Sequence, residues 1–172
     1  MQHIWIINTN NSTTIFYRKY SDMELDPDLV SGLLTALNNF SEVELKGHGI
    51  QSIDMGGLKW VYSHQIEVSL LIIAAGDKDS NSEVMRSRLE IIAKMFIQTF
   101  EITNEMMTKG LVKIDRFREF ETTLDMLNSQ WKQAEKAMGA AAMFDMLGIF
   151  QQLFNIFSQI VKYNFFGDKL DI

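Results

Sequence analysis

Few residues in this sequence could bind a metal or act as a general base, and they are widely spaced. The histidines His3, His48 and His64 form no H-x-x-x-H or H-E-x-x-H pattern, which a zinc site on one helix would need. The 172-residue chain has no cysteine, which excludes disulfides, thiolate nucleophiles and thiolate metal sites. We therefore expect ordinary surface or strand-edge histidines and no metal site.

Two other short patterns contain groups that bind ligands elsewhere. Gly47-His48-Gly49 lacks the third glycine and the following helix of a phosphate-binding loop, and the lysine loop of a GTPase is missing. Asp77, Asp79 and Glu83 carry oxygen ligands, but Lys78 interrupts them and no glycine-centred calcium loop is present. A solvated turn before a helix N-terminus explains these acids better. No nucleophile lies beside a base at an interpretable spacing, so we predict a non-enzyme without a cofactor.

Apolar runs predict the strands of a sheet. HIWIIN and TIFYRKY, separated by the polar NTNNST, predict a hairpin, and Gly56-Gly57 predicts a turn between two further strands. The last run, IEVSLLIIAA at 66–75, is apolar throughout, as expected for a central strand buried on both faces.

Periodic apolar residues predict three helices. Asp26 and Pro27 are typical of a helix start, and an apolar stripe then runs to about Phe40: Leu29, Val30, Leu33, Leu34, Leu37 and Phe40. Ser80 and Glu83 have capping-box spacing, so a second helix is expected from there, with one apolar face of Met85, Leu89, Ile92, Phe96 and Phe100. A long helix is predicted over 111–138, where no glycine or proline occurs and one apolar seam steps by three and four: Ile114, Phe117, Phe120, Leu124, Leu127, Trp131, Ala134 and Met138.

The order of these elements predicts an α+β fold with a five-stranded, mainly antiparallel sheet flanked by helices, β-β-α-β-β-β-α-α. With the stretches 26–45, 49–63 and 68–76, this order resembles the longin domain and its roadblock relatives, in particular the stand-alone longin-type proteins of archaea rich in small GTPases. We accordingly expect a longin-like domain over 1–131 and a helical C-terminal extension over 132–172.

The resemblance implies a role without catalysis. Longin-like domains bind protein partners through exposed helix and sheet-edge surfaces, often as homo- or heterodimers. The expected partners are therefore a small GTPase, another longin- or roadblock-type subunit, or both, in a membrane-trafficking-like system. A scaffold, a regulator or one subunit of an exchange factor would fit this expectation.

The C-terminal segment over 143–166 is nearly as apolar as a membrane span. Its polar residues, however, advance by three and four, so it is a two-faced helix, and charged groups such as Asp145 and Lys162 would each cost about 2.5–3.5 kcal/mol at a bilayer centre. We expect no span. Because its polar face carries amide and hydroxyl groups rather than the Lys and Arg of a lipid-binding helix, we expect burial against protein, first against the chain's own domain or a twin and next against another protein, with peripheral contact with lipid as the remaining alternative. The apolar face comprises Met143, Met146, Leu147, Phe150, Leu153, Phe154, Phe157, Ile160 and Val161.

The remaining features concern partners and location. Trp60 and Tyr62 point to the same side of one strand and are either core residues or interface anchors.

A net charge of −6 makes nucleic acid an unfavourable partner. The N-terminus has no signal-peptide pattern, so we expect a cytoplasmic protein, with contact to the cytoplasmic face of a membrane as an option. A sensor that holds a small ligand between sheet and helix is the main alternative function.

Overall fold

The structure is a computed structural model and describes residues 1–44, 50–110 and 113–137. The chain forms two compact units, Met1–Asn128 and Ser129–Ile172. The predicted C-terminal amphipathic segment and the Gly47-His48-Gly49 loop lie outside the described residues. Within the described part of the chain, no helix has the length and apolar character that crossing a membrane requires.

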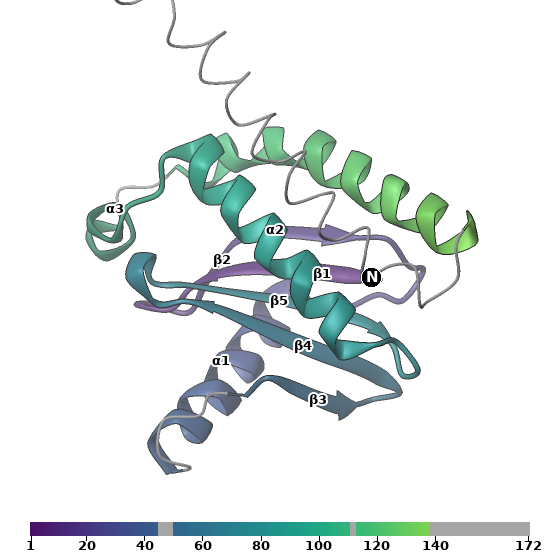
Figure 1. Ribbon diagram of the computed structural model, residues 1–172. Coiled ribbons are helices and arrows are strands. Elements are labelled where there is room, and N and C mark those ends of the chain that lie inside the picture. Colours follow the sequence, from purple (N-terminus) through teal and green to yellow (C-terminus); the bar gives the residue numbers. More distant parts are fainter. Residues whose placement is uncertain (45–49, 111–112, 138–172) are drawn as a thin grey trace, which may run out of the picture. The chain divides into compact units, whose positions relative to one another are not determined.

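The first unit is built on one antiparallel sheet of five strands in the order β2-β1-β5-β4-β3 (Figure 1). The predicted fold class is thereby confirmed. β5 is the central strand, with β1 on one side and β4 on the other, and every residue of β1 and all but the last of β5 are accordingly buried. The strands are β1 His3–Asn8, β2 Thr13–Lys19, β3 Ser52–Met55, β4 Leu58–Gln65 and β5 Leu70–Asp77.

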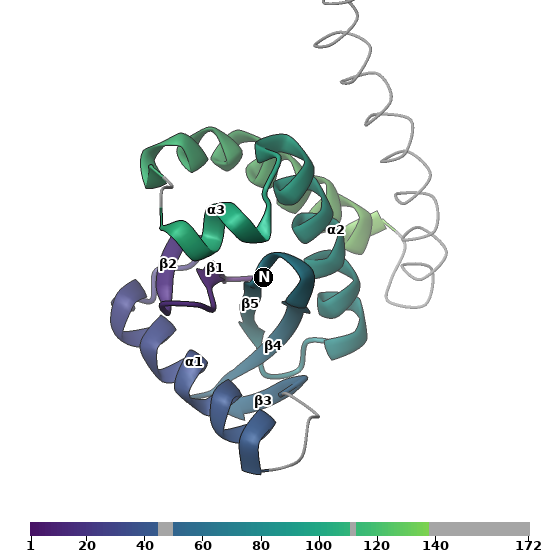
Figure 2. The ribbon, with the colours of Figure 1, turned by 90° about the vertical axis from the view of Figure 1, so that its left-hand side faces the viewer.

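Helices cover both faces of this sheet (Figures 1 and 2). On one face lies α1, Pro27–Glu44, and on the other lie α2, Ser82–Phe100, and the start of a helix over 120–137. Between the last two come α3, Asn104–Lys109, and the 3-10 turn η2, Ile114–Glu119. Asp26 caps α1 by accepting hydrogen bonds from the backbone N–H groups of Asp28 and Leu29, as its position before Pro27 predicts.

Local turn chemistry explains three differences from the predicted elements. Residues 66–68 form the 3-10 turn η1, because β4 and β5 pair as a hairpin that must reverse there, and Ser69 takes the left-handed conformation that ends the turn. Asn81, rather than Ser80, caps α2. The predicted helix over 111–138 begins only at residue 120, since the preceding six residues adopt the tighter η2.

Phenylalanines fill the core between the sheet and α2. Phe96 of α2 is fully buried, and its ring centroid lies 5.0–6.2 Å from those of four other phenylalanines in β2, α2, η2 and the helix over 120–137. These four are Phe16, Phe100, Phe117 and Phe120. The predicted apolar face of α2 is confirmed, because Met85, Leu89, Ile92, Phe96 and Phe100 are all buried.

Candidate interaction surface

The outward face of α1 is apolar. Leu29, Leu33, Phe40 and Val43 are 75%, 50%, 61% and 74% exposed, and Ala36 between them is also exposed. With about 100° of rotation per residue, these five side chains fall within an arc of about 80°. We call this set of five the α1 outer stripe. Single exposed leucines are normal on a protein surface, but a contiguous stripe marks an interaction site.

Charged side chains are missing from the middle of α1. From Leu29 to Ser41 the helix has no charged residue. A solvated helix face normally carries Lys, Arg, Asp or Glu, because these groups keep their hydration there. The α1 outer stripe therefore has the composition of a surface that is covered when the protein acts.

The inward face of α1 is largely polar. Ser31 Oγ accepts a 2.8 Å hydrogen bond from Thr14 Oγ1 of β2, and Asn38 Oδ1 lies 2.6 Å from Nε2 of His64 in β4. Ser31, Asn38 and the neighbouring Thr35 and Ser41 are buried, and Leu34 is the one large apolar residue of the described part of α1 that is fully buried. These contacts fix which side of α1 meets the sheet.

The aromatic side chains of the sheet explain this orientation. Beneath α1, Trp5 of β1 lies 5.0 Å from Tyr17 and 5.4 Å from Trp60, measured between ring centroids. Tyr62 is buried in the same cluster. Large rings on the sheet leave room for small serine and threonine side chains on the helix. The apolar stripe predicted for α1 is consequently split, with Leu34 inside and Leu29, Leu33 and Phe40 outside.

Trp60 and Tyr62 do not belong to the surface. They are 4% and 2% exposed, and the indole nitrogen of Trp60 donates a 3.0 Å hydrogen bond to the backbone oxygen of Met55. Their role as interface anchors is therefore corrected to core packing beneath α1, since β4 turns this face toward the helix. The other predicted partner-binding residues, from Met143 to Ile160, lie outside the described residues.

One serine–histidine pair has the spacing of a nucleophile and its base. Ser21 Oγ lies 2.8 Å from Nε2 of His3, and Tyr17 Oη lies 2.9 Å from Nδ1 of the same ring. His3 is fully buried and stacks on Trp5 and Tyr17. Its burial and the positive charge of Lys19 lower the pKa of His3. A general base of this kind must stabilise an imidazolium, and these surroundings oppose it. The contacts instead tie β1 to β2 and the loop after it.

The lowered pKa of His3 makes the stability of this unit depend on pH. In the unfolded chain a histidine has a pKa of about 6.5, so on acidification the unfolded state binds the proton first. The stability that the neutral, buried His3 contributes to the folded state is therefore complete above about pH 6.5. It is lost as the pH falls toward the pKa of His3 in the folded protein. We expect the urea concentration at the midpoint of unfolding to decrease when the pH is lowered from 7.5 to 5.5. In the His3→Gln variant this decrease should be smaller. Equal declines in the two proteins would contradict this assignment.

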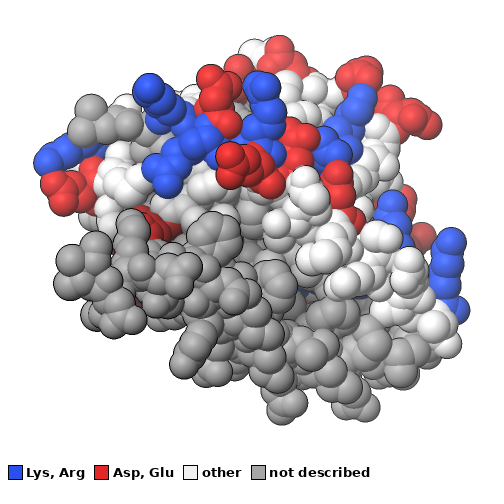
Figure 3. All heavy atoms as spheres, turned by 90° about the horizontal axis from the view of Figure 1, so that it is seen from above, with Lys and Arg blue, Asp and Glu red and all other residues white. Residues whose placement is uncertain are grey.

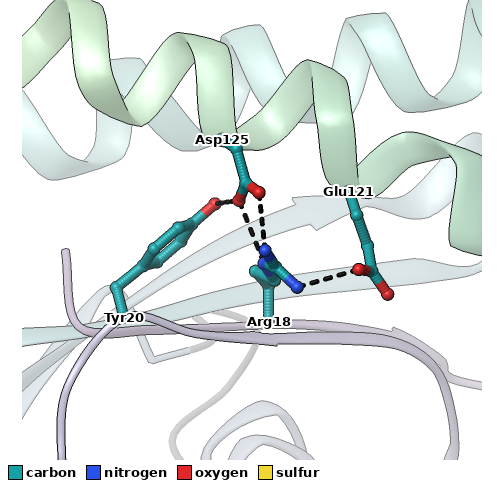
Figure 4. Close-up of polar contacts among 4 residues, drawn as sticks. All are labelled: Arg18, Tyr20, Glu121 and Asp125. Carbon is teal, nitrogen blue, oxygen red and sulfur yellow. Dashed lines mark hydrogen bonds and ion pairs between the residues drawn. The ribbon is translucent and has the colours of Figure 1, made fainter.

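Arg18 of β2 attaches the helix over 120–137 to the sheet (Figure 4). Its Nε and Nη2 atoms donate hydrogen bonds of 3.0 and 2.5 Å to the two carboxylate oxygens of Asp125, and Nη1 donates one of 2.8 Å to Glu121. Tyr20 donates a further 2.8 Å hydrogen bond to Asp125. Hydrogen bonding to Asp125 raises the pKa of Arg18, and burial raises that of Tyr20. The geometry is that of a bidentate structural tie.

Charge on the face seen from above is mixed. Lysine and arginine side chains alternate there with aspartate and glutamate (Figure 3). Among the described residues, no three His, Asp or Glu side chains are grouped as a metal site would require. Asp77, Asp79 and Glu83 are exposed, and Asp77 accepts a 2.7 Å hydrogen bond from Gln2. The α1 outer stripe is therefore the candidate site that the described residues favour.

Comparison with known proteins adds no family to this picture. No protein-family model matches the sequence, and no curated protein matches it significantly.

Proposed function

We propose that this chain is a protein-interaction module that docks a partner on the α1 outer stripe and performs no covalent chemistry. The observation that carries the proposal is the exposure of Leu29, Leu33, Phe40 and Val43 on one side of a helix that has no charged residue from Leu29 to Ser41. A helix whose apolar face lies outward is a standard element of protein recognition, in which residues at i, i+3, i+4 and i+7 anchor the contact.

Regulation of small GTPases is the specific role that we propose. The element order β-β-α-β-β-β-α and the antiparallel sheet support a longin-like domain, and such domains act as scaffolds or exchange-factor subunits. In such a role the module stabilises one conformation of the GTPase, so the bound nucleotide is released at a different rate. The cytoplasm, or the cytoplasmic face of a membrane, would be the site of action.

Phe40→Lys tests the docking surface. Phe40 is 61% exposed, and a lysine near a helix C-terminus interacts favourably with the helix dipole, so the fold should tolerate it. Binding should weaken at least about tenfold, since a partner would have to desolvate the ammonium group. The measurements are binding of purified small GTPases from the same organism by calorimetry, and release of a fluorescent GDP analogue from them.

The matched control is Ile66→Lys. Ile66 is the most exposed large apolar residue of the described chain, at 85%, and it lies in η1 rather than on α1. It should leave binding unchanged. If the unmodified protein binds none of these GTPases and alters no release rate, the GTPase role is wrong. If binding occurs but the two variants weaken it equally, the α1 outer stripe is not the docking surface.

A small-ligand sensor is a second candidate, favoured by three buried polar atoms between sheet and helix. The Trp5 indole nitrogen, the Thr35 hydroxyl and the Tyr62 hydroxyl have no hydrogen-bond partner among the described residues. Buried polar groups normally have partners, so a ligand or water molecule could satisfy these. Mass spectrometry of molecules released on denaturation should find a retained ligand if this candidate is correct.

A further inference from the structure

We propose that the partner segment that docks on the α1 outer stripe is a cationic amphipathic helix of another protein, with lysine or arginine residues beside its apolar face. This inference rests on the proposed function, because it uses the same surface, and it names the chemistry of the partner. The stripe supplies the apolar contact, and the charges at the two ends of α1 select the partner.

The negative charge of this chain is concentrated around α1. Between Lys19 and Lys46 the sequence contains six acidic residues and no lysine, arginine or histidine. Subtracting these six from the 22 acidic residues of the chain leaves 16, which equals the 16 basic residues. The net charge of −6 is therefore due entirely to this stretch. Its acidic residues are Asp22, Glu24, Asp26, Asp28, Glu42 and Glu44.

These acidic residues lie toward the two ends of α1, and the apolar stripe lies between them. Before and within the first turn, Asp26 and Asp28 are exposed. Glu42 and Glu44 belong to the last turn, which contains no basic residue. At about 1.5 Å rise per residue, the uncharged stretch between Asp28 and Glu42 is about 21 Å long. A matching partner therefore has an apolar face of about this length with positive charge at its ends.

The C-terminal end of α1 is the more negative of the two. A helix dipole places partial negative charge there, so acidic side chains are unfavourable at that end and cations are favourable. Glu42 and Glu44 add to this negative charge. At the other end, Asp26 and Asp28 lie beside the positive end of the dipole, and Glu24 is paired with Lys19. We therefore expect a lysine or arginine of the partner beside the last turn of α1.

The same charges disfavour other occupants of the stripe. A second copy of this chain would bring two stretches of charge −6 together, and like charges placed side by side weaken an interface. The anionic surface of a membrane would be repelled in the same way. A cationic helix avoids both penalties, and helix-on-helix packing through residues at i, i+3, i+4 and i+7 suits the shape of the stripe.

The area of the stripe predicts a weak contact. Large apolar side chains carry on the order of 150 Å² each, so four that are half to three-quarters exposed contribute roughly 400 Å². With an equal area from the partner, about 800 Å² is buried before the rim is included, below the roughly 1,200–2,000 Å² of a stable complex. For an isolated helix we expect a dissociation constant on the order of ten micromolar or weaker.

Two synthetic helices test the preference for positive charge. Each has about 14 residues, enough to cover about 21 Å, with leucines at the same helical positions and either lysine or glutamate at all others. Fluorescence anisotropy measures their binding to the full-length protein at low salt. The lysine helix should bind at least about tenfold more tightly, and added salt should reduce this difference because it screens charge. Equal or tighter binding of the glutamate helix, or no binding of either, overturns the proposal.

Glu42→Gln combined with Glu44→Gln tests where the attraction arises. This double variant should weaken binding of the lysine helix about five- to tenfold. Its matched control is Glu67→Gln with Asp79→Asn, which removes two charges from exposed positions away from α1. The control should weaken binding less than about twofold, since charges beyond about 10 Å are largely screened. Equal weakening by the two double variants would show a diffuse attraction and overturn the proposal.

Phe40→Ser and Ile66→Ser locate the bound helix, because they remove exposed apolar side chains without adding a charge that would itself repel lysine. Phe40→Ser should weaken binding at least about tenfold, and Ile66→Ser should not. Binding that ignores Phe40→Ser would place the helix elsewhere and overturn the proposal. So would a dimer of the chain, seen by sedimentation, that the lysine helix does not dissociate.

The two proposals can fail separately. If the glutamate helix binds as tightly as the lysine helix and Phe40→Ser weakens both, the stripe docks helices without regard to charge. The cationic partner would then be wrong, and the docking function would survive. If the lysine helix binds as expected but the small GTPases neither bind nor change their release rate, the GTPase role is wrong and the partner is another cationic protein.

Discussion

Replacing Phe96 by alanine should lower the free energy of unfolding by about 3–5 kcal/mol, a large part of the roughly 5–15 kcal/mol that a domain of this size has. Phe96 is fully buried and its ring contacts four phenylalanines from four different elements. Truncation at this point therefore leaves a cavity where β2, α2, η2 and the helix over 120–137 meet. Partial collapse cannot fill it, because rings held on separate elements cannot all move together.

Met126→Ala is the control for this prediction. Met126 lies on the helix over 120–137 but is 45% exposed, so its truncation should change stability by less than about 1 kcal/mol. Chemical denaturation followed by tryptophan fluorescence measures both variants. Similar losses in the two proteins would show that the phenylalanine cluster does not carry the stability of this core.

Sequence patterns predicted the sheet well because local and long-range requirements agreed. The strand His3–Asn8 has the predicted ends, and the Gly56-Gly57 turn occurs where two residues with positive φ are needed. The apolar face of α2 was also correct, since Met85 to Phe100 repeat at helical spacing, and the apolar residues that flank this face, Val84, Ile91 and Met95, are buried as well. In such elements the hydrophobic pattern by itself identifies the face that is buried.

The orientation of α1 could not be predicted in this way. Its leucines include both Leu34, which faces the sheet, and Leu29 and Leu33, which face outward. What decides between them is the size of the rings on the sheet, and this becomes known only once Trp5, Trp60 and Tyr62 are placed on the same face. A signal was present: Ser31, Thr35 and Asn38 also repeat at helical spacing, and all are small or able to form hydrogen bonds. The candidate site was missed because the sequence pattern predicts a single apolar stripe from Leu29 to Phe40, whereas the structure divides these residues between the inward and outward faces of α1.

The tryptophan beneath α1 provides the second large effect. Trp5 is fully buried and its ring lies 5.0–5.5 Å from those of His3, Tyr17 and Trp60, measured between centroids. We expect Trp5→Ala to cost about 3–5 kcal/mol, since it removes the centre of the cluster on which α1 rests. Among the described residues of α1, Leu34 and the partly buried Val30 are the apolar side chains that join this cluster, so the variant should also expose α1 to hydrogen exchange before the remainder of the unit.

Trp5→Phe separates packing from polarity at the same position. Phenylalanine keeps an aromatic ring in the cluster and removes the indole N–H, which has no partner among the described residues. Leaving such a group buried costs about 1–3 kcal/mol, so its removal should offset most of the lost volume. The expected change is within about 1 kcal/mol of the parent protein, measured by the same denaturation. A loss as large as that of Trp5→Ala would mean that the nitrogen is hydrogen-bonded in solution. Water or a retained ligand would then occupy the layer between α1 and the sheet, and a ligand found there by mass spectrometry would favour the sensor over the simple docking module.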